Sequence, residues 1–164
     1  MRIKLDDLQI DNAHKVAKLK TNDCIDNTQK HRDYNIKVTN SFDLNLQGCL
    51  GEQALAVYLG VEYYHTGFDP TANDVVGYEV RATRCKTGRL FTQDWDKNGL
   101  YVLAIIEPNN VINLVGWSNL KRCNLNCNKD LTLPKPCYAM PQAYLWPMDM
   151  LPETALYQCA KTNK

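Results

Sequence analysis

The sequence lacks a long hydrophobic run, which excludes a helix that crosses a membrane. No apolar stretch approaches the roughly 18 residues that such a helix needs, and residues 1–7 carry no signal-peptide core. Seven cysteines without a secretory signal favour reduced thiols. We therefore expect a cytoplasmic protein with no membrane partner.

An excess of charge of one sign is also lacking, because 19 Lys and Arg residues stand against 18 Asp and Glu residues. The net charge of +1 leaves no overall basic surface of the kind that nucleic-acid-binding domains carry. This balance argues against a protein that coats DNA non-specifically. It leaves open an enzyme with a local basic groove, because a cleft concentrates the electrostatic field of the charges that line it.

Two common kinds of ligand site are missing as well. The chain contains no Gly-rich phosphate loop. Cys123, Cys127 and Cys137 have three and nine residues between them, a spacing that matches no strong zinc motif. No His lies between Cys123 and Cys159, so we prefer buried or unpaired thiols over structural zinc.

What is present is the composition of an ordinary globular domain, with 164 residues of which 45% are hydrophobic and 23% charged. We expect a single domain over 1–164 in three parts: an N-terminal extension at 1–41 with a helix over 5–20, a core at 42–118, and an irregular, Pro-rich segment at 119–164. The predicted strands are 61–65, 78–84, 89–93, 100–106 and 111–117. The apolar run at 100–106 is typical of a strand covered on both faces.

The most informative stretch is Asp74-Val-Val-Gly-Tyr-Glu79-Val80-Arg81. In a strand that begins at residue 78, alternation puts Glu79 and Arg81 on one face, roughly 6.5 to 7 Å apart. Gly77 can supply a positive φ, so a tight turn over 75–78 can fold Asp74 back toward Glu79. Two converging carboxylates suit a hard divalent cation such as Mg²⁺. The alternative is a surface ion pair, worth about 0 to 1 kcal/mol.

A predicted amphipathic helix over 43–60 precedes this stretch and ends at a Gly. Gly48 and Gly51 each cost the helix roughly 1 kcal/mol relative to Ala, so we expect them to permit the close approach of another backbone. Glu52 follows the second of these glycines. Taken alone, Glu52 is an ordinary solvated Glu.

These motifs resemble those of the PD-(D/E)xK nuclease superfamily, and in particular small phage-type proteins. The likeness lies in the helical Gly51-Glu52, then Asp74, then Glu79-Val80-Arg81, followed by Gly116-Trp117 and a Tyr-x-x-Pro-Gln segment at 138–142. It implies an α/β (α+β) fold with a restriction-endonuclease-like core, a central mixed sheet of four to five strands flanked by helices.

The resemblance also implies the residues of a site. Asp74 and Glu79 would hold Mg²⁺ or Mn²⁺, the backbone carbonyl of Val80 would be a further metal ligand, and Glu52 would complete the metal or water shell. The implied activity is metal-dependent cleavage of DNA phosphodiesters. The implied place is the cytoplasm of a bacterial or phage-infected host cell.

Arg81 departs from the family pattern, because the family usually has Lys at this position. A guanidinium is not deprotonated in a protein, so Arg81 is excluded as a general base. It can still stabilise phosphoryl charge. Lys86, in a predicted hairpin turn over 85–89, offers a second ammonium group. Together with Arg84 and Arg89, these cations would suit a phosphate backbone.

Other residues leave their roles open. Asp69 competes with Asp74 as the upstream acid, because Asp-Pro is a common turn. Lys30, His31 and Arg32 lie in a polar segment that we interpret as a solvated loop. Four aromatic side chains can stack on bases if exposed, although sealing the core is the preferred interpretation: Trp117, Tyr138, Tyr144 and Trp146.

Two hypotheses stand beside the nuclease. The first is a catalytically degenerate nuclease fold that binds nucleic acid or a protein partner without cleavage, since a fold does not imply its function. The second is a structural protein in which Asp74, Glu79 and Arg81 belong to an internal ion-pair network.

Overall fold

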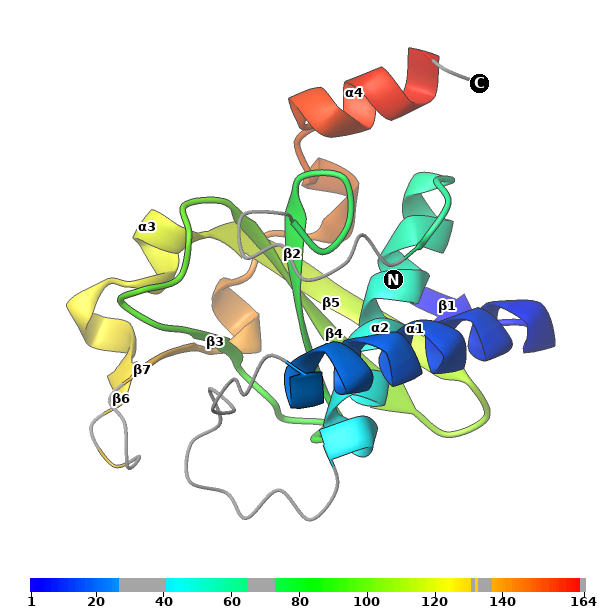
Figure 1. Ribbon diagram of the computed structural model, residues 1–164. Helices are drawn as coiled ribbons and strands as arrows, with labels where there is room; N and C mark the ends of the chain where they lie inside the picture. The colour runs from blue at the N-terminus through cyan, green and yellow to red at the C-terminus, as the bar shows by residue number, and fades with distance from the viewer. Residues whose placement is uncertain (27–40, 65–72, 131, 133–136, 163–164) are drawn as a thin grey trace.

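The computed structural model describes residues 1–26, 41–64, 73–130, 132 and 137–162. They form a mixed α+β fold with a four-stranded mixed sheet, in the order β1–β5–β4–β2, and a three-stranded sheet, in the order β3–β7–β6 (Figure 1). The strands are β1 (Arg2–Lys4), β2 (Tyr78–Thr83), β3 (Leu90–Thr92), β4 (Leu100–Glu107), β5 (Val111–Asn119), β6 (Lys129–Asp130) and β7 (Cys137–Met140). The helices are α1 (Asp7–Asp26), α2 (Ser41–Leu59), α3 (Leu120–Cys123) and α4 (Ala155–Thr162), with 3₁₀ turns η1 (Asn126–Asn128), η2 (Gln142–Tyr144) and η3 (Met148–Met150).

The central sheet confirms the expected mixed sheet flanked by helices. Strands β4 and β5 form an antiparallel hairpin, and Asn109 and Asn110 turn it with φ angles of 60° and 61°. Asn tolerates this left-handed conformation better than most residues. β1 pairs with β5 antiparallel, whereas β2 pairs with β4 parallel. β2 is therefore the last strand at one side of the described sheet.

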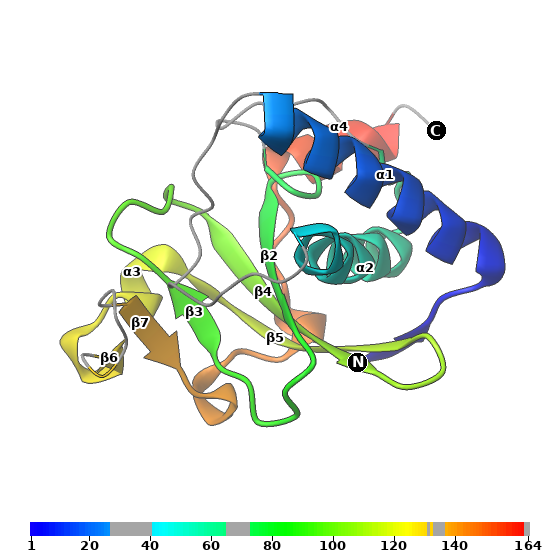
Figure 2. The same cartoon turned by 60° about the horizontal axis from the view of Figure 1, so that its bottom comes forward.

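Strand β4 is buried on both faces, as its apolar run predicts. Val102 and Ala104 belong to the main core, which α1 and α2 cover. Tyr101 and Leu103 point to the other face and pack with residues of β3 and β7 in a second cluster. Figure 2 shows the two long helices on one side of the sheet and β3 and β7 on the other.

Helix α2 lies very close to the sheet at Gly51. A Cβ atom at this position would lie 3.0 Å from the Cβ of Ala82, 3.1 Å from Val80 Cγ1 and 3.2 Å from the Cβ of Ala104. The expected close approach is thus confirmed at Gly51, where a side chain would meet the sheet. At Gly48 the nearest atom to such a Cβ is Glu52 Oε1, at 3.6 Å.

The strands differ from the sequence prediction in two respects, one in their pairing and one in their number. We expected a hairpin over 85–89, but β3 pairs with β7 rather than with β2. Parallel neighbours such as β2 and β4 need a long crossover, and residues 84–99 provide it. The strand predicted at 61–65 is wrong for residues 61–64, which are irregular.

The ends of the chain contain more regular structure than expected. The N-terminal segment adds β1 ahead of the predicted helix, and the Pro-rich segment adds β6, β7 and α4.

Trp117 and Trp146 pack together with ring centroids 4.6 Å apart, so these two aromatic rings seal the core. Lys30 to Arg32 and Asp69 lie outside the described residues. None of the described helices is both long and apolar enough to span a membrane.

We predict opposite effects on stability for the two helical glycines. Gly51→Ala should lower the free energy of unfolding, because overpacking costs about 1 to 3 kcal/mol and outweighs the helix-propensity gain of about 1 kcal/mol. Gly48→Ala is the matched control and should be stabilising by up to about 1 kcal/mol. Urea unfolding measures both. Equal stabilisation by the two substitutions would contradict the close contact at Gly51.

Candidate active site

A tight turn places Asp74 beside the start of β2. Val75 and Tyr78 exchange both backbone hydrogen bonds, at 3.1 and 2.8 Å, and the two residues between them have positive φ angles, 35° at Val76 and 96° at Gly77. This is the turn that Gly77 predicts. As a result, Asp74 Oδ2 accepts a hydrogen bond of 2.8 Å from the backbone N–H of Val80.

Glu79 and Arg81 share one face of β2, as alternation predicts. Arg81 Nη1 lies 3.8 Å from Glu79 Oε2. Arg81 Nη2 lies 3.1 Å from a carboxylate oxygen of Asp96, and the guanidinium carbon lies 5.1 Å above the ring of Tyr101. Arg81 is therefore fixed by three neighbours, and Asp96 is a site residue that sequence reasoning missed.

A lysine does lie against Glu79, but it comes from another part of the chain. Lys97 Nζ lies 2.8 Å from Glu79 Oε1. Lys97 belongs to the loop between β3 and β4, which also supplies Asp96. By contrast, Lys86 is exposed in the turn after β2, where its carbonyl accepts a hydrogen bond from Gln142. Lys97 rather than Lys86 thus places an ammonium group beside Glu79.

Glu52 is buried and not solvated, with only 5% of its surface exposed. Its two carboxylate oxygens lie 2.9 and 2.7 Å from Lys20 Nζ, and the hydroxyl of Tyr63 donates to Oε2 at 2.6 Å. Burial, followed by the charge of Asp74, raises the pKa of Glu52 to about 7, although Lys20 and Tyr63 act in the opposite direction. Neither Lys20 nor Tyr63 was identified from the sequence.

Asp74 links the two sides of the site electrostatically. Burial, followed by the charge of Asp74, also raises the pKa of Glu79, against the effects of Lys97 and Arg81. Asp74 therefore acts on Glu52 on the α2 side and on Glu79 on the other side. Since the N–H and C=O of one strand residue point the same way, the carbonyl of Val80 points to the edge where Asp74 lies.

Asp74 and Glu79 are the carboxylates that a divalent cation at this site would use. Mg²⁺ is commonly held by one or two carboxylates together with water and substrate oxygens. Within the described ranges, no group of three or more His, Cys, Asp or Glu side chains is placed to hold a metal ion. Both oxygens of Glu79 face cations, so a divalent ion would compete with Lys97 and Arg81.

The candidate site draws on segments that are distant in the sequence. Its acids come from α2, from the turn before β2, from β2 itself and from the loop before β4. Comparison of the chain with protein-family models, with curated proteins and with solved structures found no match. The chemistry of the site must therefore be argued from its own residues.

We predict that Glu52 makes the stability of the protein depend on pH. Its folded-state pKa of about 7 lies above the usual value of 4.5, so the native state binds more protons than the unfolded chain between these pH values. The free energy of unfolding of the wild type should fall, relative to that of Glu52→Gln, as the pH rises through this window. Urea unfolding at several pH values measures the difference. Parallel curves for the two proteins would show that burial does not perturb Glu52.

Proposed function

We propose that this protein is a nuclease-like protein with a restriction-endonuclease-like core, acting on DNA phosphodiesters with Mg²⁺ or Mn²⁺. The observation that carries the proposal is that Asp74, held beside β2 by the N–H of Val80, acts electrostatically on Glu79, which itself lies beside the cations of Arg81 and Lys97. Acids and cations side by side are what phosphodiester cleavage needs, because the acids hold a metal ion and the cations stabilise phosphoryl charge.

Each residue of the site has a distinct role in this proposal. Asp74 and Glu79 hold the metal ion, which when bound activates water and neutralises charge on a phosphoryl oxygen. Arg81 binds a phosphate oxygen through its guanidinium, because this group is always charged and has several donors. Lys97 supplies the ammonium group that the resemblance leads one to expect at position 81. Glu52, enclosed by Lys20 and Tyr63, is coupled electrostatically to Asp74.

A second candidate function is binding of nucleic acid without cleavage. The observation in its favour is that the carboxylates already have cationic partners: Glu79 faces Lys97 and Arg81, and Glu52 faces Lys20. In a protein that only binds, these ion pairs persist and the basic side chains meet phosphates. The two functions differ in whether a divalent ion enters the site.

Cleavage assays with matched variants separate the two functions. The wild type with Mn²⁺ should cut plasmid or single-stranded DNA, whereas Glu79→Ala should not. Lys97→Met should lower kcat by about 100-fold or more, the usual loss when one group that stabilises developing charge is removed. Lys4→Met removes an exposed lysine from β1 and should leave kcat unchanged. Full activity in Glu79→Ala would refute the proposed site.

Metal binding is tested separately from cleavage. Calorimetric titration with Mn²⁺ should give heat with the wild type and none with Asp74→Ala, since Asp74 is one of the two proposed carboxylate ligands. Arg81→Lys probes the departure from the family pattern, and a large gain in activity would mean that the natural chain has lost catalytic power at this position. A wild type that binds DNA but takes up no Mn²⁺ would support binding without cleavage.

A further inference from the structure

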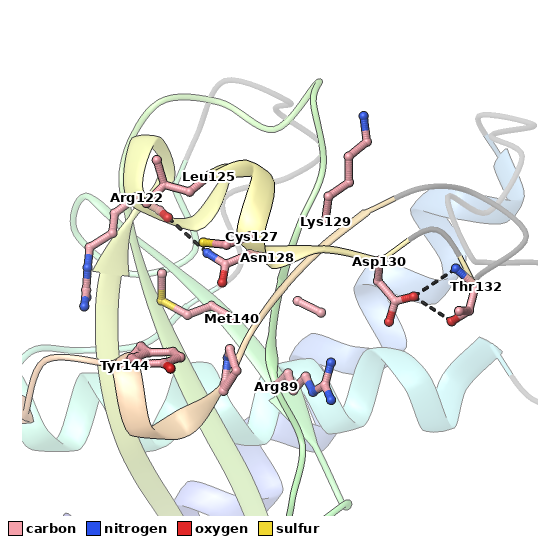
Figure 3. Close-up of a pocket in the computed structure, with 12 residues that line it drawn as sticks. Arg89, Arg122, Leu125, Cys127, Asn128, Lys129, Asp130, Thr132, Met140 and Tyr144 are labelled. Carbon is pink, nitrogen blue, oxygen red and sulfur yellow. Dashed lines mark hydrogen bonds between the residues drawn. The ribbon is translucent and has the colours of Figure 1, made fainter.

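A second feature lies on the other side of the molecule from the long helices. An open cavity of about 680 Å³ is lined by residues of α3, η1, β6, β7 and η2 and by the residue before β3 (Figure 3). This volume is typical of a pocket for a small organic ligand. Its lining includes the apolar residues Leu125 and Met140, the ring of Tyr144, three basic residues and one acid: Arg89, Arg122, Lys129 and Asp130. None of these residues belongs to the candidate active site.

The cationic part of the lining is held in place. The guanidinium carbon of Arg122 stacks 4.2 Å above the ring of Trp146. No ion pair joins Arg122 to a carboxylate of the described residues, and its buried Nη1 has no hydrogen-bond partner among them. Arg89 is exposed at the other wall, where it acts electrostatically on Asp130. Arg122 thus holds a fixed positive charge beside the cavity, and Asp130 is the acid in the cavity lining.

The aromatic part of the lining is exposed. Tyr144 keeps 60% of its surface accessible, unlike Trp117 in the core. It ends η2, and the first residue of that turn, Gln142, donates two hydrogen bonds of 2.9 Å to the carbonyls of Lys86 and Gly88. These bonds tie the segment that carries Tyr144 to the turn that leads into Arg89. The backbone that carries Tyr144 is thus held beside the turn that precedes Arg89.

Basic residues lie along the chain between the candidate active site and this cavity. Arg81 lies in β2, Arg84 and Lys86 are exposed in the turn that follows, and Arg89 lines the cavity. The turn folds back on β2, because a Cβ at Gly88 would clash with Thr83. Arg81 and Arg89 are eight residues apart, at most about 29 Å of extended chain. A strand of nucleic acid a few nucleotides long can follow this series of cations.

We propose that the cavity binds an unpaired nucleotide of a nucleic-acid strand. Its base stacks on Tyr144 beside Met140, and its phosphate lies at the exposed Arg89. Every base has a π-face that an aromatic ring can meet, whereas a base inside a duplex has both faces covered by its neighbours. The inference rests on the proposed function, because the bound strand is the one whose phosphodiester reaches Asp74.

Binding of the full chain to a fluorescent oligothymidylate of about 12 nucleotides tests the proposal, since single-strand binding sites cover roughly 4 to 16 nucleotides. EDTA in the buffer prevents cleavage. Tyr144→Ala should weaken binding by about 5- to 100-fold, the usual effect of losing one stacked base. Tyr144→Phe keeps the ring and should bind as the wild type does. A duplex of the same length should bind more weakly than the single strand and should not respond to Tyr144→Ala.

The salt dependence of binding tests the phosphate contacts. Arg89→Ala should reduce the slope of log affinity against log salt by about 0.7, the contribution of one single-strand phosphate. Arg2→Ala is the matched control, because Arg2 is an exposed arginine on β1 and should leave the slope unchanged. Alkylation of Cys127, an exposed thiol in the cavity lining, should slow when the oligonucleotide is bound.

The outcomes separate this inference from the proposed function. No binding by the wild type, unchanged affinity in Tyr144→Ala, or equal affinity for duplex and single strand would each overturn the cavity proposal. If cleavage depends on Glu79 but binding does not depend on Tyr144, the nuclease stands and the cavity proposal falls. If binding depends on Tyr144 but no Mn²⁺-dependent cleavage occurs, the cavity proposal stands and the nuclease falls.

Discussion

The contact between α2 and the sheet at Gly51 is the constraint on which the rest of the structure depends. Because Gly51 has no side chain, the helix backbone packs directly against side chains of both β2 and β4. These side chains belong to Val80, Ala82 and Ala104. This contact involves both parallel strands, β2 and β4, and it fixes the distance between the helix and the sheet. It also sets Glu52, the next residue, close to the start of β2. The electrostatic coupling of Glu52 with Asp74 follows from this packing.

Local patterns in the sequence were sufficient to predict much of this arrangement. Alternation in β2 placed Glu79 and Arg81 on one face, and Gly77 marked the turn that returns Asp74 to the strand. The continuous apolar run of β4 indicated burial on both faces. Each of these features depends on neighbours within about one turn or strand, where the period of the backbone fixes the direction of a side chain.

Features that depend on distant pairing were not predictable in the same way. The sequence predicted that the strand at Leu90 would form a hairpin with the preceding strand. In the structure it pairs with β7, some fifty residues later. Lys20 meets Glu52, and Lys97 meets Glu79. A charged residue in a loop carries no signal of its partner, because only the folded chain brings the two together. The cluster of Asp94, Asp96 and Lys97 between two apolar strands was the one available hint.

The carboxylate of Asp74 has a consequence for association between molecules. β2 is the outermost strand of the described sheet, and unpaired N–H groups on such a strand invite another chain to add a strand of its own. Asp74 occupies one of these donors, at Val80, and brings a negative charge to the edge. It therefore discourages edge-to-edge polymerisation through β2. This effect of Asp74 on the sheet edge does not depend on metal binding at the site.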